Sequence, residues 1–137
     1  MTRDEIIAFM NANRDSYMAT VEGNKPHVRG MGIVKADENG IIIQTSTYKD
    51  IYKQLSANPN VELCFHNPKQ GIQVRVSGTV EPVDDRGLKD EIIAMRPFLK
   101  SQIEKNGYEA IVVYRLKGRA TVWTMETNFE PKIYIQL

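Results

Sequence analysis

The sequence predicts a mainly β protein, an antiparallel barrel of six to eight strands with helices at its rim. Segments in which apolar residues alternate with polar ones recur along the chain, and short turns rich in glycine, asparagine and proline join them as hairpins. Helical spacing is confined to three or four short segments, which do not alternate with the strands as crossover helices would. With 137 residues, 42% of them hydrophobic, the chain can bury the core of one domain spanning residues 1–137.

Composition excludes several classes of protein. The 18 Lys and Arg nearly balance the 17 Asp and Glu, so no strong field favours nucleic acid or an anionic membrane as a partner. The single Cys64 cannot form an intrachain disulfide, and with only His27 and His66 beside it we expect no metal site. The acidic start and the absence of a stretch of about 20 apolar residues indicate neither a signal peptide nor a membrane span, so we expect a cytoplasmic protein.

The first half of the chain is expected to begin with a helix and continue with three strands. Thr2 and Glu5 have the spacing of a capping box, which starts the helix. The strands that follow are expected to form an antiparallel meander, with turns at 22–26 and 37–40 and strands at 17–21, 27–35 and 41–43.

The second half is expected to contain a short helix, a hairpin, two further helical pieces and the last strands. Hydroxyl residues in 45–50 are expected to cap the helix over 51–57, and Asp84 and Asp85 to cap the next one. The expected strands are 61–65, 72–82, 108–116, 119–125 and 131–136, with a turn at Lys117-Gly118.

The joint between the strand at 41–43 and the next helix is a candidate phosphate site. Thr45, Ser46 and Lys49 would bring hydroxyls and an ammonium to a helix N-terminus, and Lys53 follows one turn later. The alternative interpretation is that a hydroxyl only caps the helix and both lysines are solvated.

Arg29 and Gln73 are two further candidates for ligand binding. Arg29 precedes Gly30 and Gly32 within a strand, where glycine often marks the close approach of a backbone or ligand. The Gln73 amide could bind a ring that carries both donors and acceptors. Alternatively, both side chains simply face solvent.

Four short motifs, in this order and spacing, resemble the flavin-binding split-barrel family that includes the pyridoxamine phosphate oxidases. The resemblance extends from Tyr17 to the C-terminus and implies a split antiparallel β-barrel that binds FMN. The motifs are His27-Val28-Arg29-Gly30-Met31-Gly32, Ile43-Gln44-Thr45-Ser46, Lys53-Gln54-Leu55-Ser56-Ala57-Asn58-Pro59-Asn60-Val61 and Ile72-Gln73-Val74-Arg75-Val76-Ser77-Gly78-Thr79.

In that family a strand arginine and a basic residue at the next helix hold the flavin phosphate, the strand backbone lies along the ring, and a glutamine binds its polar edge. The resemblance implies cofactor-binding roles for Arg29, Gly30, Met31, Gly32, Thr45, Ser46 and Gln73.

Two departures from the family pattern change these expectations. Lys49-Asp50-Ile51 stands where the oxidases have serine, arginine and lysine, so Lys49 is expected to contact the phosphate, with Lys53 in reserve. Trp123 matches a family tryptophan, but residues 124–129 lack the arginine and histidine that bind the oxidases' substrate, so a vitamin substrate is not expected. Trp123 would pack on the flavin of a partner chain, or alternatively belong to the core.

The resemblance therefore implies a homodimer with FMN at the subunit interface, passing electrons from NAD(P)H to a small acceptor such as a nitroaromatic or quinone-like compound. The helical insert 84–107 would set acceptor specificity, and no catalytic acid or base is assigned. The alternatives are a non-enzymatic FMN carrier or stress protein, and a barrel that binds haem or a deazaflavin; His66 would matter in the haem case.

Overall fold

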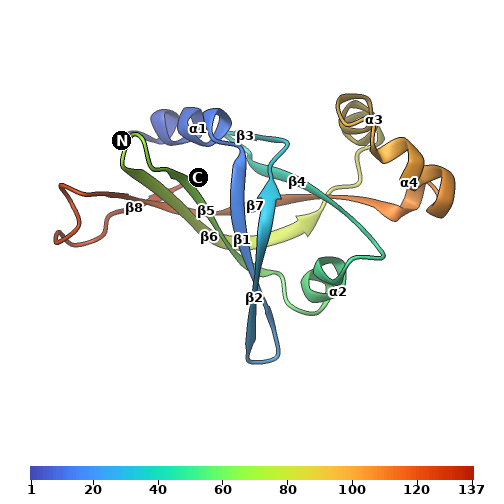
Figure 1. The fold of residues 1–137 in the computed structure, drawn as a ribbon, viewed down its shortest axis with the longest axis horizontal. Coiled ribbons are helices and arrows are strands. Elements are labelled where there is room, and N and C mark those ends of the chain that lie inside the picture. Colours follow the sequence, from blue (N-terminus) through green and yellow to red (C-terminus); the bar gives the residue numbers. More distant parts are fainter.

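The computed structural model covers residues 1–137, which form one antiparallel sheet of eight strands with four α-helices around it (Figure 1). Neighbouring strands follow the order β2-β1-β5-β6-β7-β4-β3, and β8 pairs with β7. This confirms the predicted antiparallel sheet with helices at its rim. The strands are β1 (Asp15–Glu22), β2 (Lys25–Gly32), β3 (Lys35–Asp37), β4 (Gly40–Ser46), β5 (Asn60–Asn67), β6 (Ile72–Pro82), β7 (Ile111–Thr124) and β8 (Tyr134–Gln136).

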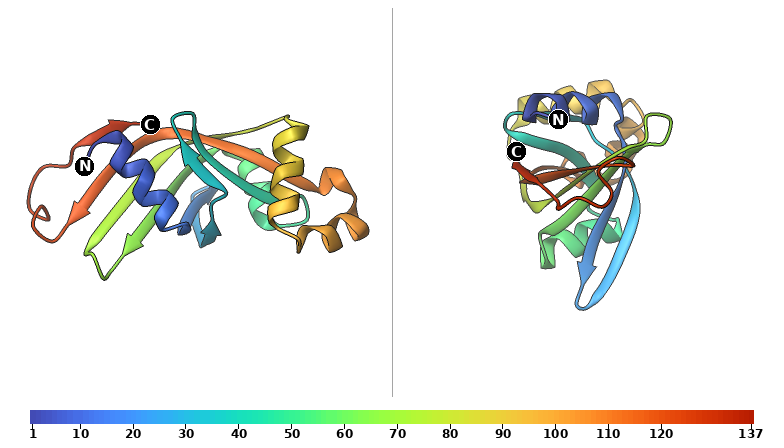
Figure 2. Two further views of the ribbon diagram at one scale, coloured as in Figure 1. Left: turned by 90° about the horizontal axis from the view of Figure 1, so that it is seen from above. Right: turned by 90° about the vertical axis from the view of Figure 1, so that its left-hand side faces the viewer.

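The helices lie at the ends and the open side of the sheet (Figure 2). None of them has the length and apolar character needed to cross a membrane. They are α1 (Arg3–Ala12), α2 (Asp50–Ala57), α3 (Arg86–Met95) and α4 (Leu99–Asn106), with a 3-10 turn at Tyr108–Ala110.

Helix α1 begins at the predicted capping box and supports the edge strand β3. The Thr2 hydroxyl accepts from the Glu5 amide, and the Thr2 amide donates to the Glu5 carboxylate, both at 3.2 Å. At the other end, the Asn11 side chain donates to the Ala36 carbonyl at 2.8 Å and accepts from the Ala36 amide at 2.9 Å. Because β3 has a strand neighbour only on its β4 side, α1 supplies hydrogen bonds that a strand would otherwise provide.

Strand β4 lies between two hydrophobic clusters, and all seven of its residues are buried. Ile41 and Ile43 belong to the main core of 19 residues, on the inner face of the sheet. Ile42 points to the other face, into a second cluster with Ile92 of α3 and Leu99 of α4. The insert that contains α3 and α4 is therefore packed on the sheet through β4.

The strand predicted over 27–35 is divided into β2 and β3, so the first three predicted strands do not form one continuous meander. β1 and β2 form one hairpin and β3 and β4 another, but the two hairpins lie at opposite ends of the strand order. β4 pairs with β3 along one edge and with β7 over six residues along the other. β4 is buried on both faces there, whereas pairing with the edge strand β2, which has no buried residue, would leave it exposed.

The predicted turn at Lys117-Gly118 is also wrong, because β7 runs unbroken through both residues. Gly118 lies directly opposite Gly78 of β6. A Cβ atom on Gly78 would overlap the Lys117 carbonyl oxygen, and one on Gly118 would overlap the Ser77 carbonyl oxygen. The glycine pair therefore marks a close backbone approach within two continuous strands rather than a chain reversal.

This close approach predicts that Gly78→Ala destabilises the fold. The added methyl group would force the two backbones apart, at a cost of about 1 to 3 kcal/mol in the free energy of unfolding. Gly30→Ala is the matched control, since it also lies in a strand and a Cβ atom there would meet nothing within 4 Å. Urea unfolding of both variants measures the difference; equal stabilities would contradict the steric argument.

Candidate functional site

Arg29 is held in place on the inner side of β2 by neutral oxygen atoms of β1 and α2. Its Nη1 donates to the Met18 carbonyl at 3.1 Å and to the Thr20 hydroxyl at 2.9 Å, and its Nη2 donates to Gln54 Oε1 at 2.6 Å. The Thr20 hydroxyl itself donates to the same Gln54 oxygen at 2.5 Å. Burial lowers the pKa of Arg29, and the nearby charge of Asp50 acts in the opposite direction. The guanidinium keeps its charge, because an arginine pKa lies far above neutrality.

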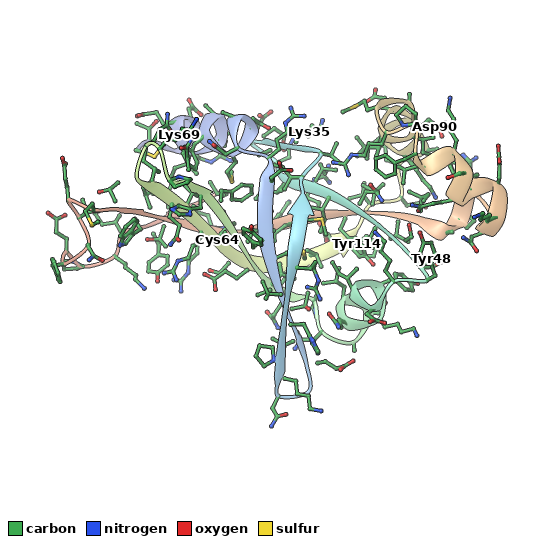
Figure 3. The ribbon with its side chains drawn as sticks, in the orientation of Figure 1. Lys35, Tyr48, Cys64, Lys69, Asp90 and Tyr114 are labelled. Carbon is green, nitrogen blue, oxygen red and sulfur yellow. The ribbon has the colours of Figure 1, made fainter.

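Lys49 and Lys53 lie on the exposed side of α2, beside the Arg29 network. Lys49 is the N-cap residue of the helix, and Lys53 immediately precedes the buried Gln54. Neither lysine forms an ion pair of 4.0 Å or less. The exposed Tyr48, which precedes Lys49, marks their position in Figure 3. The structure thus brings Arg29 and the start of α2 together, as the phosphate-site hypothesis requires.

Thr45 and Ser46 are not helix caps, contrary to the prediction that hydroxyl residues cap this helix. They belong to β4 and are buried, and the helix starts after Lys49 without a side-chain cap. The Ser46 hydroxyl donates to Gln102 Oε1 of α4 at 2.8 Å. The burial of β4 between two clusters explains the difference, because continued strand pairing to Ile111 keeps these residues in the sheet.

Gly30, Met31 and Gly32 form the second half of the edge strand β2. A Cβ atom on Gly30 would meet nothing within 4 Å, so a flat molecule can approach the backbone there. Met31 packs against the main core, and its carbonyl accepts from the Ser16 hydroxyl at 2.6 Å. Of the three residues, Gly30 offers the open backbone.

Gln73 and Trp123 face each other across β6 and β7 on the outer side of the sheet. Gln73 alternates with the buried Val74, which places the two on opposite faces of β6. Both residues line a cavity of about 490 Å³ that the segment after β7 encloses. The Trp123 indole N–H donates to Asn128 Oδ1 at 2.7 Å, which fixes the orientation of the ring. Trp123 is half-buried beside this cavity and is absent from both buried core clusters.

The two sets of predicted residues lie on opposite faces of the sheet. Arg29 pairs with the buried Met18 and points inward, whereas Gln73 lies on the outer face with Cys64, which Figure 3 labels. Figure 1 shows α2 well away from the segment between β7 and β8. The cavity lined by Gln73 and Trp123 contains neither Arg29 nor the two lysines.

Arg96, at the C-terminal end of α3, is a site-supporting residue that sequence reasoning missed. Its Nη1 donates to Gln44 Oε1 at 2.9 Å, and its Nη2 donates to the carbonyls of Gly32 at 3.2 Å and Ile33 at 3.1 Å. Burial lowers the pKa of Arg96, and the charge of Arg14 lowers it further. Arg96 therefore ties the helical insert to the end of β2. Its local sequence gives no signal of this role.

Gln54 and Thr20 are two further site residues that were not predicted, although each is a polar residue at a position that the sequence pattern assigns to the core. Gln54 lies at an apolar position of the helical pattern, between Ile51 and Leu55, and is 6% exposed. Thr20 occupies an inward position of β1 and is fully buried. A polar residue at a position that the pattern assigns to the core requires a hydrogen-bond partner. Here that partner is the guanidinium of Arg29.

Comparison with known proteins agrees with this architecture. The family model described as pyridoxamine 5'-phosphate oxidase matches residues 2–131. Pyridoxine/pyridoxamine 5'-phosphate oxidase of Anaeromyxobacter dehalogenans is 40% identical over 60 residues, which cover 44% of this chain and 30% of that protein. The chain spans about a third of the length of the curated relatives it matches.

Two solved structures share the fold. A NimC/NimA family protein from Clostridium acetobutylicum is 27% identical with a TM-score of 0.78, covering 98% of this chain and 92% of that one. A pyridoxamine 5'-phosphate oxidase-related, FMN-binding protein from Nostoc punctiforme is 19% identical with a TM-score of 0.69, covering 96% and 88%. The predicted split antiparallel β-barrel is confirmed, and the chain belongs to the pyridoxamine 5'-phosphate oxidase family.

Proposed function

We propose that this chain binds FMN at the interface of a homodimer and passes electrons from NAD(P)H to a small acceptor. The observation that carries the proposal is the guanidinium of Arg29, which is fixed in place without an ion pair. Arg29 makes three hydrogen bonds, all to neutral oxygens, and no ion pair. Since a guanidinium has five N–H donors, two remain for an anion.

The surroundings of Arg29 fit the phosphate of FMN. Lys49 and Lys53 add two unpaired ammonium groups on the neighbouring helix. Charge-assisted hydrogen bonds from a positioned guanidinium bind phosphate oxygens strongly, and flexible lysines add attraction as point charges. The chain has no dinucleotide glycine fingerprint, so a mononucleotide suits the site better than FAD.

The outer face fits the ring of the cofactor. The Gln73 amide offers both donor and acceptor atoms beside the flat indole of Trp123, whose orientation Asn128 fixes. Gly30 leaves the backbone of β2 open to a second flat surface. These features suit a planar heterocycle such as isoalloxazine.

The separation of the two sets of residues supports a dimer. A single ligand cannot contact Arg29 and the Gln73–Trp123 pair of one chain, because the sheet lies between them. A second copy facing the outer side of the sheet would bring Gln73 and Trp123 of one subunit to the β2 edge of the other. Tyr17 and Val28 on that outer side are 61% and 70% exposed, so the free chain presents apolar surface there.

Bound FMN would supply hydride and electron transfer between a reduced nicotinamide and an acceptor. The chain's own residues would hold the phosphate through Arg29, orient the ring through Gln73, and exclude water through the segment after β7. The cavity extends beyond Gln73 and Trp123 to Arg75 and Thr121, and this space beside the ring favours an enzyme over an electron carrier, which needs no room for a substrate. The insert, tied to β2 by Arg96, would set acceptor specificity.

The absorption spectrum of the purified protein, followed by anaerobic addition of NADH or NADPH, tests this function. We expect a flavin spectrum that bleaches with one of the nucleotides and recovers when a nitroaromatic or a quinone is added. A flavin spectrum inert to both nucleotides would indicate the carrier. The absence of flavin, or a haem spectrum, would overturn the proposal.

The phosphate site predicts that Arg29→Ala lowers FMN affinity by about 1.5 to 3 kcal/mol, and that Lys53→Ala lowers it less. Riboflavin, which lacks the phosphate, should bind far more weakly than FMN and should be nearly unaffected by Arg29→Ala. Calorimetric titration of both ligands measures this difference, with urea unfolding to confirm that the variant is folded. If FMN and riboflavin bind equally, the phosphate site is misplaced.

The interface site predicts that disrupting the outer face separates the subunits and releases FMN together. Trp123→Asp should do both. Val28→Asp is the second variant, because Val28 is 70% exposed in the single chain and a charge there should leave the fold intact. Light scattering and flavin content after gel filtration measure the outcome. A monomer that retains FMN tightly would contradict the interface site.

A further inference from the structure

The cavity beside Trp123 contains polar groups that the proposed flavin contacts leave unused. Arg75 of β6 and Thr121 of β7 lie directly opposite each other, and both line the cavity. Arg75 follows Gln73 by two residues on β6, and Thr121 precedes Trp123 by two residues on β7. All four side chains therefore lie on the same face of the sheet. Two residues of a strand span about 7 Å. The pair therefore lies one step beyond the residues assigned to the ring.

Arg75 has unused hydrogen-bonding capacity. Its only polar contact is a loose one, in which Nε lies 3.8 Å from Glu62 Oε1, and its side chain is 34% exposed. Arg29 and Arg96, by contrast, each make three hydrogen bonds. A partly buried guanidinium with free N–H groups favours a bound oxyanion, and its planar fork matches a carboxylate in particular.

Thr121 is a second unsatisfied group at the same place. The residue is 6% exposed, and its hydroxyl has no hydrogen-bond partner. A buried hydroxyl without a partner is unfavourable. Because Thr121 lines the cavity opposite Arg75, its hydroxyl is available to donate to an anion held there.

The remaining wall of the cavity is suited to an aromatic body. Trp123 lines it on the same face of the sheet as Arg75 and Thr121, and the indole is fixed through Asn128. A flat aromatic molecule could lie beside this ring while an acidic substituent reached Arg75. The cavity volume of about 490 Å³ falls within the range of small-molecule sites.

We propose that Arg75 and Thr121 form a carboxylate-binding subsite, and that the ligand is a small aromatic carboxylate whose ring lies beside Trp123. Its role as the electron acceptor rests on the proposed function. The subsite itself does not, since it is built from residues on one face of one chain.

Binding of 4-nitrobenzoate and its neutral analogue 4-nitrobenzamide to the purified full-length chain tests the subsite. Calorimetry gives both affinities, and quenching of Trp123, the only tryptophan in the chain, reports whether the ligand occupies this cavity. We expect the carboxylate to bind at least about tenfold more tightly than the amide, as charge-assisted hydrogen bonds would give. Arg75→Gln should remove the preference, and Thr121→Val should reduce it.

Arg119→Gln is the matched control, because Arg119 lies on β7, stacks on Tyr134 at 4.2 Å and does not line this cavity. It should keep the carboxylate preference. Equal affinity for the two ligands, or a preference that survives Arg75→Gln, would overturn the subsite. So would a change in oligomeric state for Arg75→Gln without a change in the affinity ratio, because Arg75 would then be an interface residue.

The result of the ligand-binding test can be separated from the result of the flavin test. If the chain binds no FMN but retains the Arg75-dependent preference, the subsite stands and the flavin function fails. If FMN binds and bleaches with NAD(P)H while the preference is absent, the flavin function stands and the subsite fails.

Discussion

The register of β6 against β7 is the constraint on which the rest of the structure depends. Eleven residue pairs join the two strands, from Ile72–Thr124 to Pro82–Tyr114. A slip by one residue would turn every side chain to the other face. The observed register places Val74 and Val76 in the core, brings Gln73 opposite Trp123 on the outer face, and aligns the glycines that permit close approach.

Two arginines, Arg29 on the inner face and Arg96 on the face covered by α3 and α4, are held by hydrogen bonds without an acidic partner. Arg29 and Arg96 are both partly desolvated, and their hydrogen bonds run only to carbonyl, hydroxyl and amide oxygens. Neutral oxygens orient a guanidinium but do not cancel its charge. Both fixed charges lie near β2 although the net charge is only +1, so bulk composition gives no hint of an anionic ligand there.

Local patterns were sufficient to predict most elements, but not their arrangement. The capping box at Thr2 and the alternation over 72–82 match the structure, because each is decided by neighbouring residues. The neighbour of β4 is decided by burial of both its faces, with Leu116 lying opposite Ile41. Gly118 alone indicates a turn, and only its pairing with Gly78 shows that it lies within a continuous strand. For the site, residue types identified Arg29 and Gln73, whereas their placement on opposite faces required the fold.

The distance in sequence between β4 and β7 has a consequence for synthesis of the chain. β4 contains the run Ile41-Ile42-Ile43, and the strand that covers its edge begins only at Ile111. While the intervening residues are being made, one edge of this strand has no partner. The strand is uncharged and rich in isoleucine, a composition that promotes intermolecular β aggregation. Protection of this open edge by a chaperone would therefore matter most before the last fifth of the protein, from Ile111 onward, leaves the ribosome.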